Sequence, residues 1–351
     1  MTFSLKTVPF AAGAALAAML AVPLHAADVN IRIAHLNPSD PTQSHSAAMG
    51  AVFKSLVETA SDGAIQVELY PDGQLGEDHE AIAQVRAGVI ESSISSAGGI
   101  AQHYPMIGIF DMPFAFPDIG VATEVITLDS EFGERLANDM LEKTGLRTIG
   151  LMDSGGFFQL TNSQRPIESV ADMEGLRIRT MTLPTHEEMM ASLGAQPTPL
   201  PWAEVYTALQ TGVADGQMNP IQQTAFARFD EVQGYLTVSN HLITPYLWVM
   251  NEDVYQGLSD EHRTIVDWAA RIATDAGRST SRVIEASDQG LPRLAENMEV
   301  NTLSEEAREE FAERTQPQVR ALIEDNLGDE GVEMLELMME SIDNVNAERG
   351  N

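Results

Sequence analysis

The alternation of strand-like and helix-like segments near the beginning of the chain restricts its fold more than any other feature. Short apolar runs at 30–35, 65–70 and 90–95 read as strands, and helical segments at about 42–60 and 78–87 separate them. A β-α-β-α-β order is typical of parallel strands joined by crossover helices. We therefore predict an α/β fold whose first sheet is parallel.

The rest of the chain continues with elements of the same kinds. The expected helices are 118–128 and 131–143, and the expected strands are 146–152, 155–161, 176–180, 196–198, 213–218, 235–238 and 242–250. At 351 residues the chain is long enough for two domains. This order of elements fits two domains between which the chain crosses more than once.

The longest helical pattern follows Ser259, a residue suited to an N-cap, and runs from 260 to about 288 without proline. The alternative is two helices that break near Gly277. Another helix is expected from Ser304, and a final amphipathic helix at 329–347.

Arg179 stands at the end of one expected strand. Two arginines flank Ile178, so a strand would point Arg177 and Arg179 to the same side. The carboxyl edge of an α/β sheet is where ligands bind, and the planar guanidinium fork grips a carboxylate through two parallel hydrogen bonds. Arg179 is therefore a candidate carboxylate ligand, although an ordinary solvent-paired arginine is the alternative.

Three motifs around Arg179 resemble those of the TRAP-transporter solute-binding proteins of the DctP type. They are G-L-R-I-R at 175–179, L-P-W-x-E-V-Y-T-A-L-Q-T-G at 200–212 and D-G-Q-M-N-P at 215–220. The three motifs occur in the family's order and with its spacing. The resemblance extends over the mature chain, through D-G-Q-L-G at 72–76, D-M-P-F at 111–114 and T-N-x-x-R-P-I at 161–167.

The resemblance implies a two-lobed periplasmic-binding-protein fold, type II-like, with an interdomain cleft and a long helix spanning both lobes. On this basis we expect residues 27–153 plus about 240–282 to form lobe I. Residues 154–239 plus about 283–345 are expected to form lobe II. The family's function implies a receptor that delivers a small organic acid to a membrane permease.

The resemblance also assigns roles to individual residues. The strand-end arginine of the family matches Arg179, an aromatic residue that packs on the ligand matches Trp202, and an asparagine that helps to hold the carboxylate matches Asn219. Two alternatives stay open. Trp202 could belong only to the core, and Asn219 could serve only to shape the turn before Pro220.

Some positions depart from the better-known branches of the family. Sialate-type members carry a second arginine where this chain has Gln159. Ectoine-type members carry an acid where this chain has Asn37, and aromatic residues where it has Gln222 and Gln223. Together with Ser95, after the third strand, these residues predict a polar pocket suited to a small hydroxy acid. A small zwitterion or amine is the alternative ligand, given the acidic chain.

Residues 1–26 are expected to be a secretory signal peptide. Lys6 gives the positive start, 8–24 is apolar and rich in alanine, and Ala26 offers a small residue for cleavage. No later segment is long and apolar enough to span a bilayer. The chain has no cysteine, which excludes disulfides and the acylated cysteine of a lipoprotein. We therefore expect a periplasmic protein that is not inserted in the membrane.

The mature chain is strongly acidic. The formal net charge of the full chain is −32, and loss of Lys6 with the signal peptide makes it −33. Nucleic acid and anionic lipid surfaces are therefore excluded as partners. The charge fits either a surface adapted to high salt or an acidic face that meets a basic partner.

Motifs of catalysis and of cofactor binding are missing from the sequence. The nucleophile elbow, the zinc-protease H-E-x-x-H, the P-loop and the dinucleotide G-x-G-x-x-G do not occur. We predict a binding protein with no cofactor and no metal rather than an enzyme. A periplasmic enzyme that acts on a small acid and the ligand module of a sensor are the rival functions.

Overall fold

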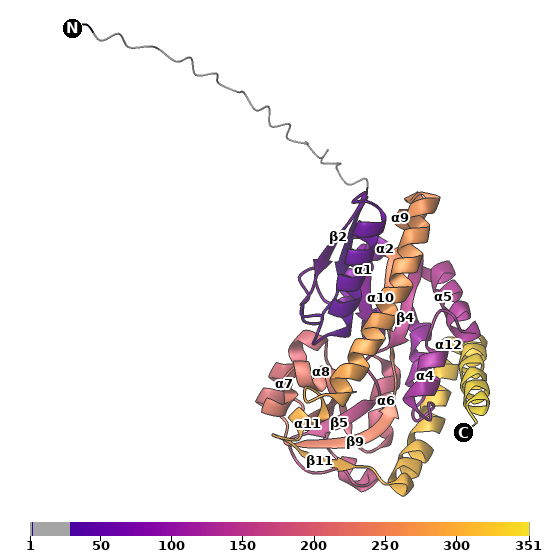
Figure 1. Cartoon of the computed structure of the whole chain (residues 1–351). Coiled ribbons are helices and arrows are strands. Elements are labelled where there is room, and N and C mark those ends of the chain that lie inside the picture. Colours follow the sequence, from indigo (N-terminus) through magenta and orange to yellow (C-terminus); the bar gives the residue numbers. More distant parts are fainter. Residues whose placement is uncertain (1, 3–28, 351) are drawn as a thin grey trace.

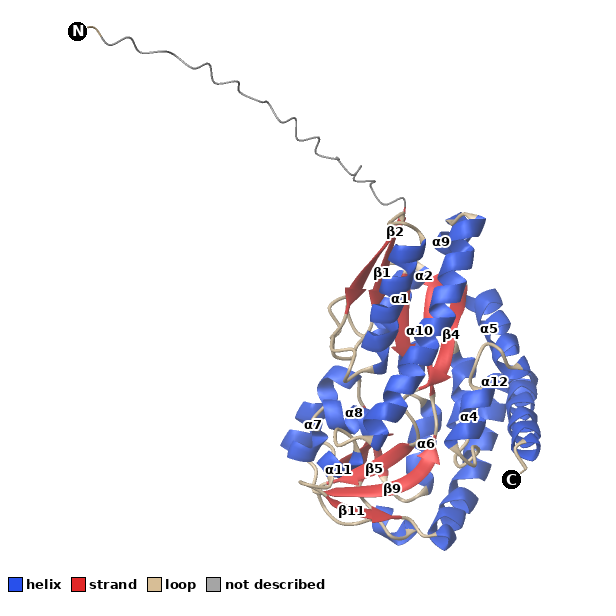
Figure 2. Ribbon diagram, viewed as in Figure 1, coloured by secondary structure: helices blue, strands red, loops and turns tan. Residues whose placement is uncertain are grey.

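The computed structural model describes residue 2 and residues 29–350. Residues 29–350 form two lobes, which lie one above the other in Figures 1 and 2. Nearly all of the predicted signal peptide, 1–26, lies outside the described residues. None of the described helices has both the length and the apolar character that a membrane span needs.

The first lobe is built on a five-stranded sheet in the order β2-β1-β3-β10-β4. Its strands are β1 (Val29–Ala34), β2 (Ile65–Tyr70), β3 (Ser92–Ser96), β4 (Leu146–Asp153) and β10 (Pro245–Asn251). The predicted parallel pairing is confirmed, because β1 runs parallel to both β2 and β3. The returning strand β10 is antiparallel to its neighbours β3 and β4.

Most helices of the first lobe begin where a side chain caps them. Helix α1 starts at His45 rather than near residue 42, because the Ser44 side chain accepts a hydrogen bond from the Ala47 N–H. The helices are α1 (His45–Ala60), α2 (Asp78–Arg86), α3 (Ala97–Ile100), the 3-10 helix η1 (Pro105–Asp111), α4 (Ile119–Val125), α5 (Glu131–Thr144) and α9 (Glu252–Gly257).

The second lobe is built on a six-stranded sheet in the order β11-β9-β5-β8-β6-β7. Its strands are β5 (Phe158–Asn162), β6 (Arg177–Thr180), β7 (Gln196–Pro199), β8 (Gly216–Pro220), β9 (Tyr235–Leu242) and β11 (Glu299–Thr302). Its helices are η2 (Val170–Met173), α6 (Pro184–Ser192), η3 (Trp202–Glu204), α7 (Val205–Thr211), α8 (Ile221–Phe226), η4 (Phe229–Glu231) and α11 (Leu291–Leu294). Strands β6, β7 and β8 are mutually parallel, so their carboxyl ends meet at one edge.

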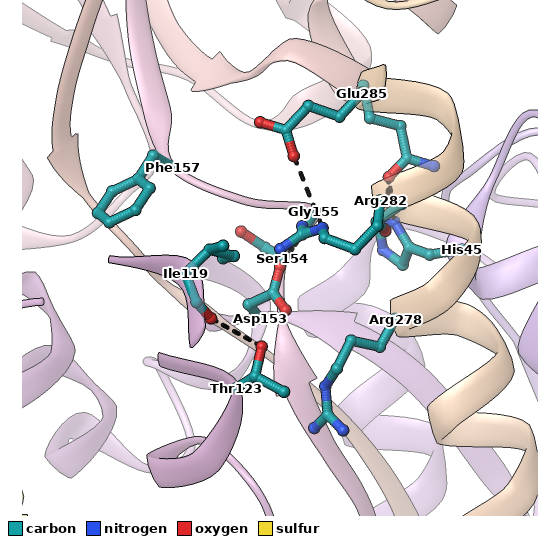
Figure 3. A network of polar contacts seen from close by, with 12 residues as sticks. His45, Ile119, Thr123, Asp153, Ser154, Gly155, Phe157, Arg278, Arg282 and Glu285 are labelled. Atoms are coloured by element: carbon teal, nitrogen blue, oxygen red, sulfur yellow. Dashed lines mark hydrogen bonds and ion pairs between the residues drawn. The ribbon is translucent and has the colours of Figure 1, made fainter. Parts of the chain in front are cut away.

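Two extended segments carry the chain between the lobes, one from β4 to β5 and the other from β9 to β10. In the first, Gly155 and Gly156 have φ angles of +109° and +113°. Glycine takes such angles without the steric penalty that a side chain brings. Figure 3 shows this crossing beside the helix that carries Arg278, Arg282 and Glu285.

Helix α10 (Asp260–Ala286) is continuous, and it runs from the first lobe down to α8 and α11 of the second (Figure 1). The long helix spanning both lobes is therefore confirmed, and the alternative of a break near Gly277 is wrong. Gly277 serves close packing instead, because a Cβ atom there would lie 2.5 Å from Cγ of Met49 on α1. Glycine at this position lets the two helices touch.

The C-terminal helix α12 (Glu305–Glu348) bends at Gly328, whose backbone angles are not helical (φ 62°, ψ −157°). Two helices were expected in this region. The part after the bend returns to the first lobe, where Glu330 pairs with Lys143 of α5 at 2.8 Å. Arg349 likewise pairs with Glu124 of α4 at 2.9 Å. The predicted lobe boundaries place 283–345 in lobe II, and this division stays a prediction.

Candidate functional site

A cavity lies between the lobes, where β1 and β3 end on one side and β6, β7 and β8 end on the other. It measures about 70 Å³, several times the roughly 10–15 Å³ that one water molecule needs. It is lined by Leu36, Asn37, Glu77, Asp78, His79, Ser96, Gly98, Gly99, Ser154, Phe158, Arg179, Met181, Thr182, Leu200, Pro201, Trp202, Asn219, Gln223, Thr244 and Tyr246. Both lobes therefore contribute to a space that fits a small molecule.

Arg179 is a buried cation on the wall of this cavity. Its side chain is 2% exposed, and its Nε and Nη2 atoms donate to the Leu200 carbonyl at 3.0 and 2.6 Å. Burial lowers the pKa of Arg179 to about 9, and no carboxylate among the described residues lies near enough to offset it. The guanidinium stays charged at neutral pH. An anion that enters the cavity therefore meets a cation that is already desolvated.

Arg177, on the same strand, is by contrast already paired. Its Nε and Nη2 atoms donate to the two oxygens of Asp215 at 2.9 and 2.5 Å. The hydrogen bond raises the pKa of Arg177 and lowers that of Asp215. Arg177 does not line the cavity. Of these two arginines, only Arg179 is open to a ligand.

Asn219 and Trp202 complete the second-lobe wall. Asn219, at the end of β8, donates through Nδ2 to Gln217 Oε1 at 2.6 Å. The Trp202 ring packs against Phe226 and Phe229, with centroids 5.9 and 5.7 Å away. Trp202 therefore both joins an apolar cluster and lines the cavity.

Asn37 and Gln223 also reach the cavity. Asn37, beyond the end of β1, donates to Ser46 Oγ at 3.0 Å. Gln223 on α8 donates through Nε2 to the Ser154 carbonyl of the crossing segment, and its buried Oε1 has no hydrogen-bond partner in the described part of the chain. The structure thus brings five of the eight predicted site residues together, and three others lie elsewhere.

Ser95, Gln159 and Gln222 are not among the residues that line the cavity. The Ser95 hydroxyl lies 2.7 Å from that of Ser93. Gln159 sits where the pairing of β5 with β9 is irregular, and its Oε1 accepts from the backbone N–H groups of Ser239 and Asn240. Gln222 turns away from the cavity towards α1 and α10.

Asp78 lines the cavity as well, although it was not among the predicted site residues. Its Oδ2 atom accepts from the Ser96 N–H and hydroxyl at 3.0 and 2.6 Å. Burial raises the pKa of Asp78 to about 6, and burial likewise raises the pKa of its neighbour Glu77. Both acids directly follow the motif at 72–76, which was the available signal.

The cavity therefore has an arginine on the second-lobe wall and carboxyl groups on the first-lobe wall. Such walls suit a ligand that is anionic at one end and donates hydrogen bonds at the other. Among residues 29–350, no group of three or more histidine, aspartate or glutamate side chains is arranged to hold a metal ion.

The family described as bacterial extracellular solute-binding protein, family 7 (DctP), matches this chain over residues 33–326. The 2,3-diketo-L-gulonate-binding periplasmic protein of Escherichia coli strain K12 is 32% identical over 268 residues, which cover 76% of this chain and 80% of that protein. The ectoine-binding periplasmic protein of Halomonas elongata is 32% identical over 328 residues, with coverages of 91% and 92%.

A solved structure shows the same fold. The sugar acid binding protein of Advenella mimigardefordensis, in complex with galactonate, aligns with a TM-score of 0.82 at 31% identity. The alignment covers 90% of this chain and 98% of that protein. All residues that line the cavity fall inside the range matched by the family.

Proposed function

Since the chain belongs to the DctP family of bacterial extracellular solute-binding proteins, the receptors of TRAP transporters, we propose that its ligand is a small hydroxylated organic acid. The single observation that carries this proposal is Arg179, a buried cation on the wall of the cavity that forms no ion pair with a carboxylate of the described residues. A ligand carboxylate would supply the missing negative charge.

The other residues of the cavity are assigned by their chemistry. Asn219 lies beside Arg179 in the lining and would share the carboxylate, and the face of Trp202 would pack on the ligand's carbon chain. Asn37, Gln223 and Asp78 would bind hydroxyl groups, because amides and carboxyl groups accept hydrogen bonds from them. A sugar acid in a similar structure and in the name of one relative supports this class of ligand.

Binding would act through closure of the two lobes. Arg179 and Asn219 belong to the second lobe, whereas Asn37 and Asp78 belong to the first. A ligand that touches both walls makes all of its contacts only when the lobes are closed, so it shifts the population towards the closed form. The closed form would then dock on a permease in the membrane.

The same proposal places the protein in the periplasm. The segment 1–26 would direct secretion and be removed. The lobes would comprise 27–153 with about 240–282, and 154–239 with about 283–345. The protein would release its ligand unchanged, as a receptor and not as an enzyme.

A thermal-shift comparison of galactonate with galactitol tests the proposal. Galactitol has the same carbon chain and lacks the carboxylate, so only galactonate should raise the melting temperature. Ectoine serves as a zwitterionic comparison. Equal shifts with galactonate and galactitol, or a shift with ectoine alone, would contradict the hydroxy-acid assignment. Proton NMR of galactonate incubated with the protein should show no new compound, and the appearance of one would favour an enzyme.

A further inference from the structure

We propose that Gln222 is a latch that holds the two lobes closed, and that it sets ligand affinity without touching the ligand. The inference rests on the proposed function only in what it says of ligand affinity. Gln222 was predicted to bind the ligand, and the structure instead places it between helices of both lobes.

The carboxamide of Gln222 is engaged on both of its sides. Its Oε1 atom lies 3.0 Å from Nδ1 of His45 and accepts from the Ser281 hydroxyl at 2.9 Å. Its Nε2 atom donates to the Gln43 carbonyl at 3.2 Å. Gln222, His45 and Ser281 are each fully buried. A buried carboxamide with three partners is well satisfied in this structure.

These bonds cross the boundary between the lobes. Gln222 is on α8, which follows strand β8 of the second lobe, whereas His45 begins α1 of the first lobe. Ser281 lies on α10, which packs along α1. If α8 moves away with the second lobe, the bonds to Gln43 and His45 must break together. The contact is therefore made only while the lobes are closed.

The latch is connected to the cavity on both sides. His45 Nε2 lies 3.3 Å from Nδ2 of Asn37, which lines the cavity, and the His45 ring meets the edge of Tyr246 at 4.6 Å. Burial lowers the pKa of His45 to about 4, so the ring is neutral. A neutral ring can donate from Nδ1 to Gln222 and accept from Asn37 at Nε2.

On the other side, the next residue is Gln223, which lines the cavity and holds the Ser154 carbonyl. Adjacent residues on a helix point about 100° apart, so α8 directs Gln223 to the ligand and Gln222 to the latch. Figure 3 shows His45 next to the turn of α10 that carries Arg282 and Glu285, with Asp153, Ser154 and Gly155 of the crossing beside it. Closure of the lobes would therefore bring Gln223 to the ligand and Gln222 to the first lobe at the same time.

The latch explains why two neighbouring glutamines follow β8. If Gln222 bound the ligand, its substitution would weaken binding because a ligand contact is lost. If Gln222 is a latch, its substitution weakens binding because the closed form of the protein becomes less populated. That population can be measured with no ligand present.

Spin labels on the two lobes provide that measurement. The chain has no cysteine, so Val89→Cys in the first lobe and Val213→Cys in the second introduce two labelling sites. Both side chains are more than half exposed and lie away from the cavity lining. Pulsed electron–electron double resonance then gives the distribution of distances between the two labels, without ligand and with galactonate. It is measured for the otherwise unchanged chain and for Gln222→Ala.

We expect the ligand-free protein to populate the closed form. In Gln222→Ala the ratio of closed to open molecules should fall at least about five-fold, because the net contribution of one hydrogen bond changes an equilibrium by about that factor. Ser281→Ala, which removes one of the three bonds to Gln222, should lower the ratio less. Gln256→Ala, which removes an exposed bond to Glu252 on α9, should leave it unchanged. If Gln222→Ala does not fold, Ser281→Ala alone decides.

A ligand-free distribution in both latch variants that matches the unchanged chain overturns the proposal. Because this readout needs no ligand, it stands even if galactonate fails to bind. Failure of galactonate to change any distribution would instead count against the proposed function. A lower melting temperature of ligand-free Gln222→Ala with an unaltered distance distribution would show that Gln222 only stabilises the fold.

Discussion

Replacement of Arg179 by alanine should weaken ligand binding more than any other single substitution in the cavity. Burial lowers the pKa of Arg179 from 12.5 to about 9, and each pKa unit corresponds to about 1.4 kcal/mol. The charged form is therefore penalised by roughly 5 kcal/mol, which a ligand carboxylate would offset. Truncating one member of a buried charge pair costs about 2–5 kcal/mol, or roughly thirty-fold to several-thousand-fold in Kd.

Isothermal titration calorimetry with galactonate measures this loss. Arg179→Lys keeps the charge but loses the planar fork that also holds the Leu200 carbonyl, so it should recover only part of the affinity. Arg177→Ala is the matched control, because Arg177 is paired with Asp215 outside the cavity, and its Kd should stay close to that of the unchanged protein. Near-normal affinity in folded Arg179→Ala would refute the carboxylate assignment.

Three further expectations concern stability. Burial raises the pKa of Asp78 to about 6, so its ionisation destabilises the fold as the pH rises from about 4 to about 6. In urea titrations Asp78→Asn should therefore be more stable than the unchanged protein by about 1–3 kcal/mol at pH 7, and equal to it below about pH 4. Asp111 accepts from Thr185 and contacts His186 Nε2 at 2.9 Å, with all three buried, so Asp111→Ala should lower the free energy of unfolding by about 2–4 kcal/mol, and a loss below about 1 kcal/mol would contradict this role. The acidic charge predicts a melting temperature that rises from low to molar salt, and a flat or falling curve would remove the high-salt interpretation.

Sequence reasoning identified the elements whose patterns are local. Strand β2 was predicted with the bounds that the structure has, Ile65–Tyr70, because alternation and flanking turns mark it. Arg179 was placed correctly near a strand end, since arginine alternates with apolar residues in the short run that forms the strand. Strand β11 (Glu299–Thr302) was missed because it is a short strand at the sheet edge with no fully buried residue and little apolar pattern.

The residues that sequence reasoning misplaced depend on non-local geometry. Gln159 stands at an irregularity between β5 and β9, and its amide is held by Ser239 and by Asn240, whose φ is +47°. No sequence pattern announces such a register shift. Alignment with a ligand-binding arginine of relatives therefore gave the position of Gln159 but not the direction of its side chain.

Asp78 was missed for a related reason. It reaches the cavity because Gly99, which is distant in sequence, leaves room for it, and a Cβ atom at Gly99 would overlap the Asp78 side chain. The two glutamines of α8 were treated as one pair, whereas helix geometry separates their directions. The direction in which each side chain of α8 points could be predicted only once the packing partners of the helix were known.

Small-angle X-ray scattering of the mature protein with and without saturating galactonate tests the central claim, that a ligand bridges the two lobes and closes them. Contacts from Arg179 on one wall and Asn37 and Asp78 on the other predict a smaller radius of gyration in the bound state, with the same molecular mass. Calorimetry establishes saturation beforehand. A scattering profile that does not change at saturation would contradict closure.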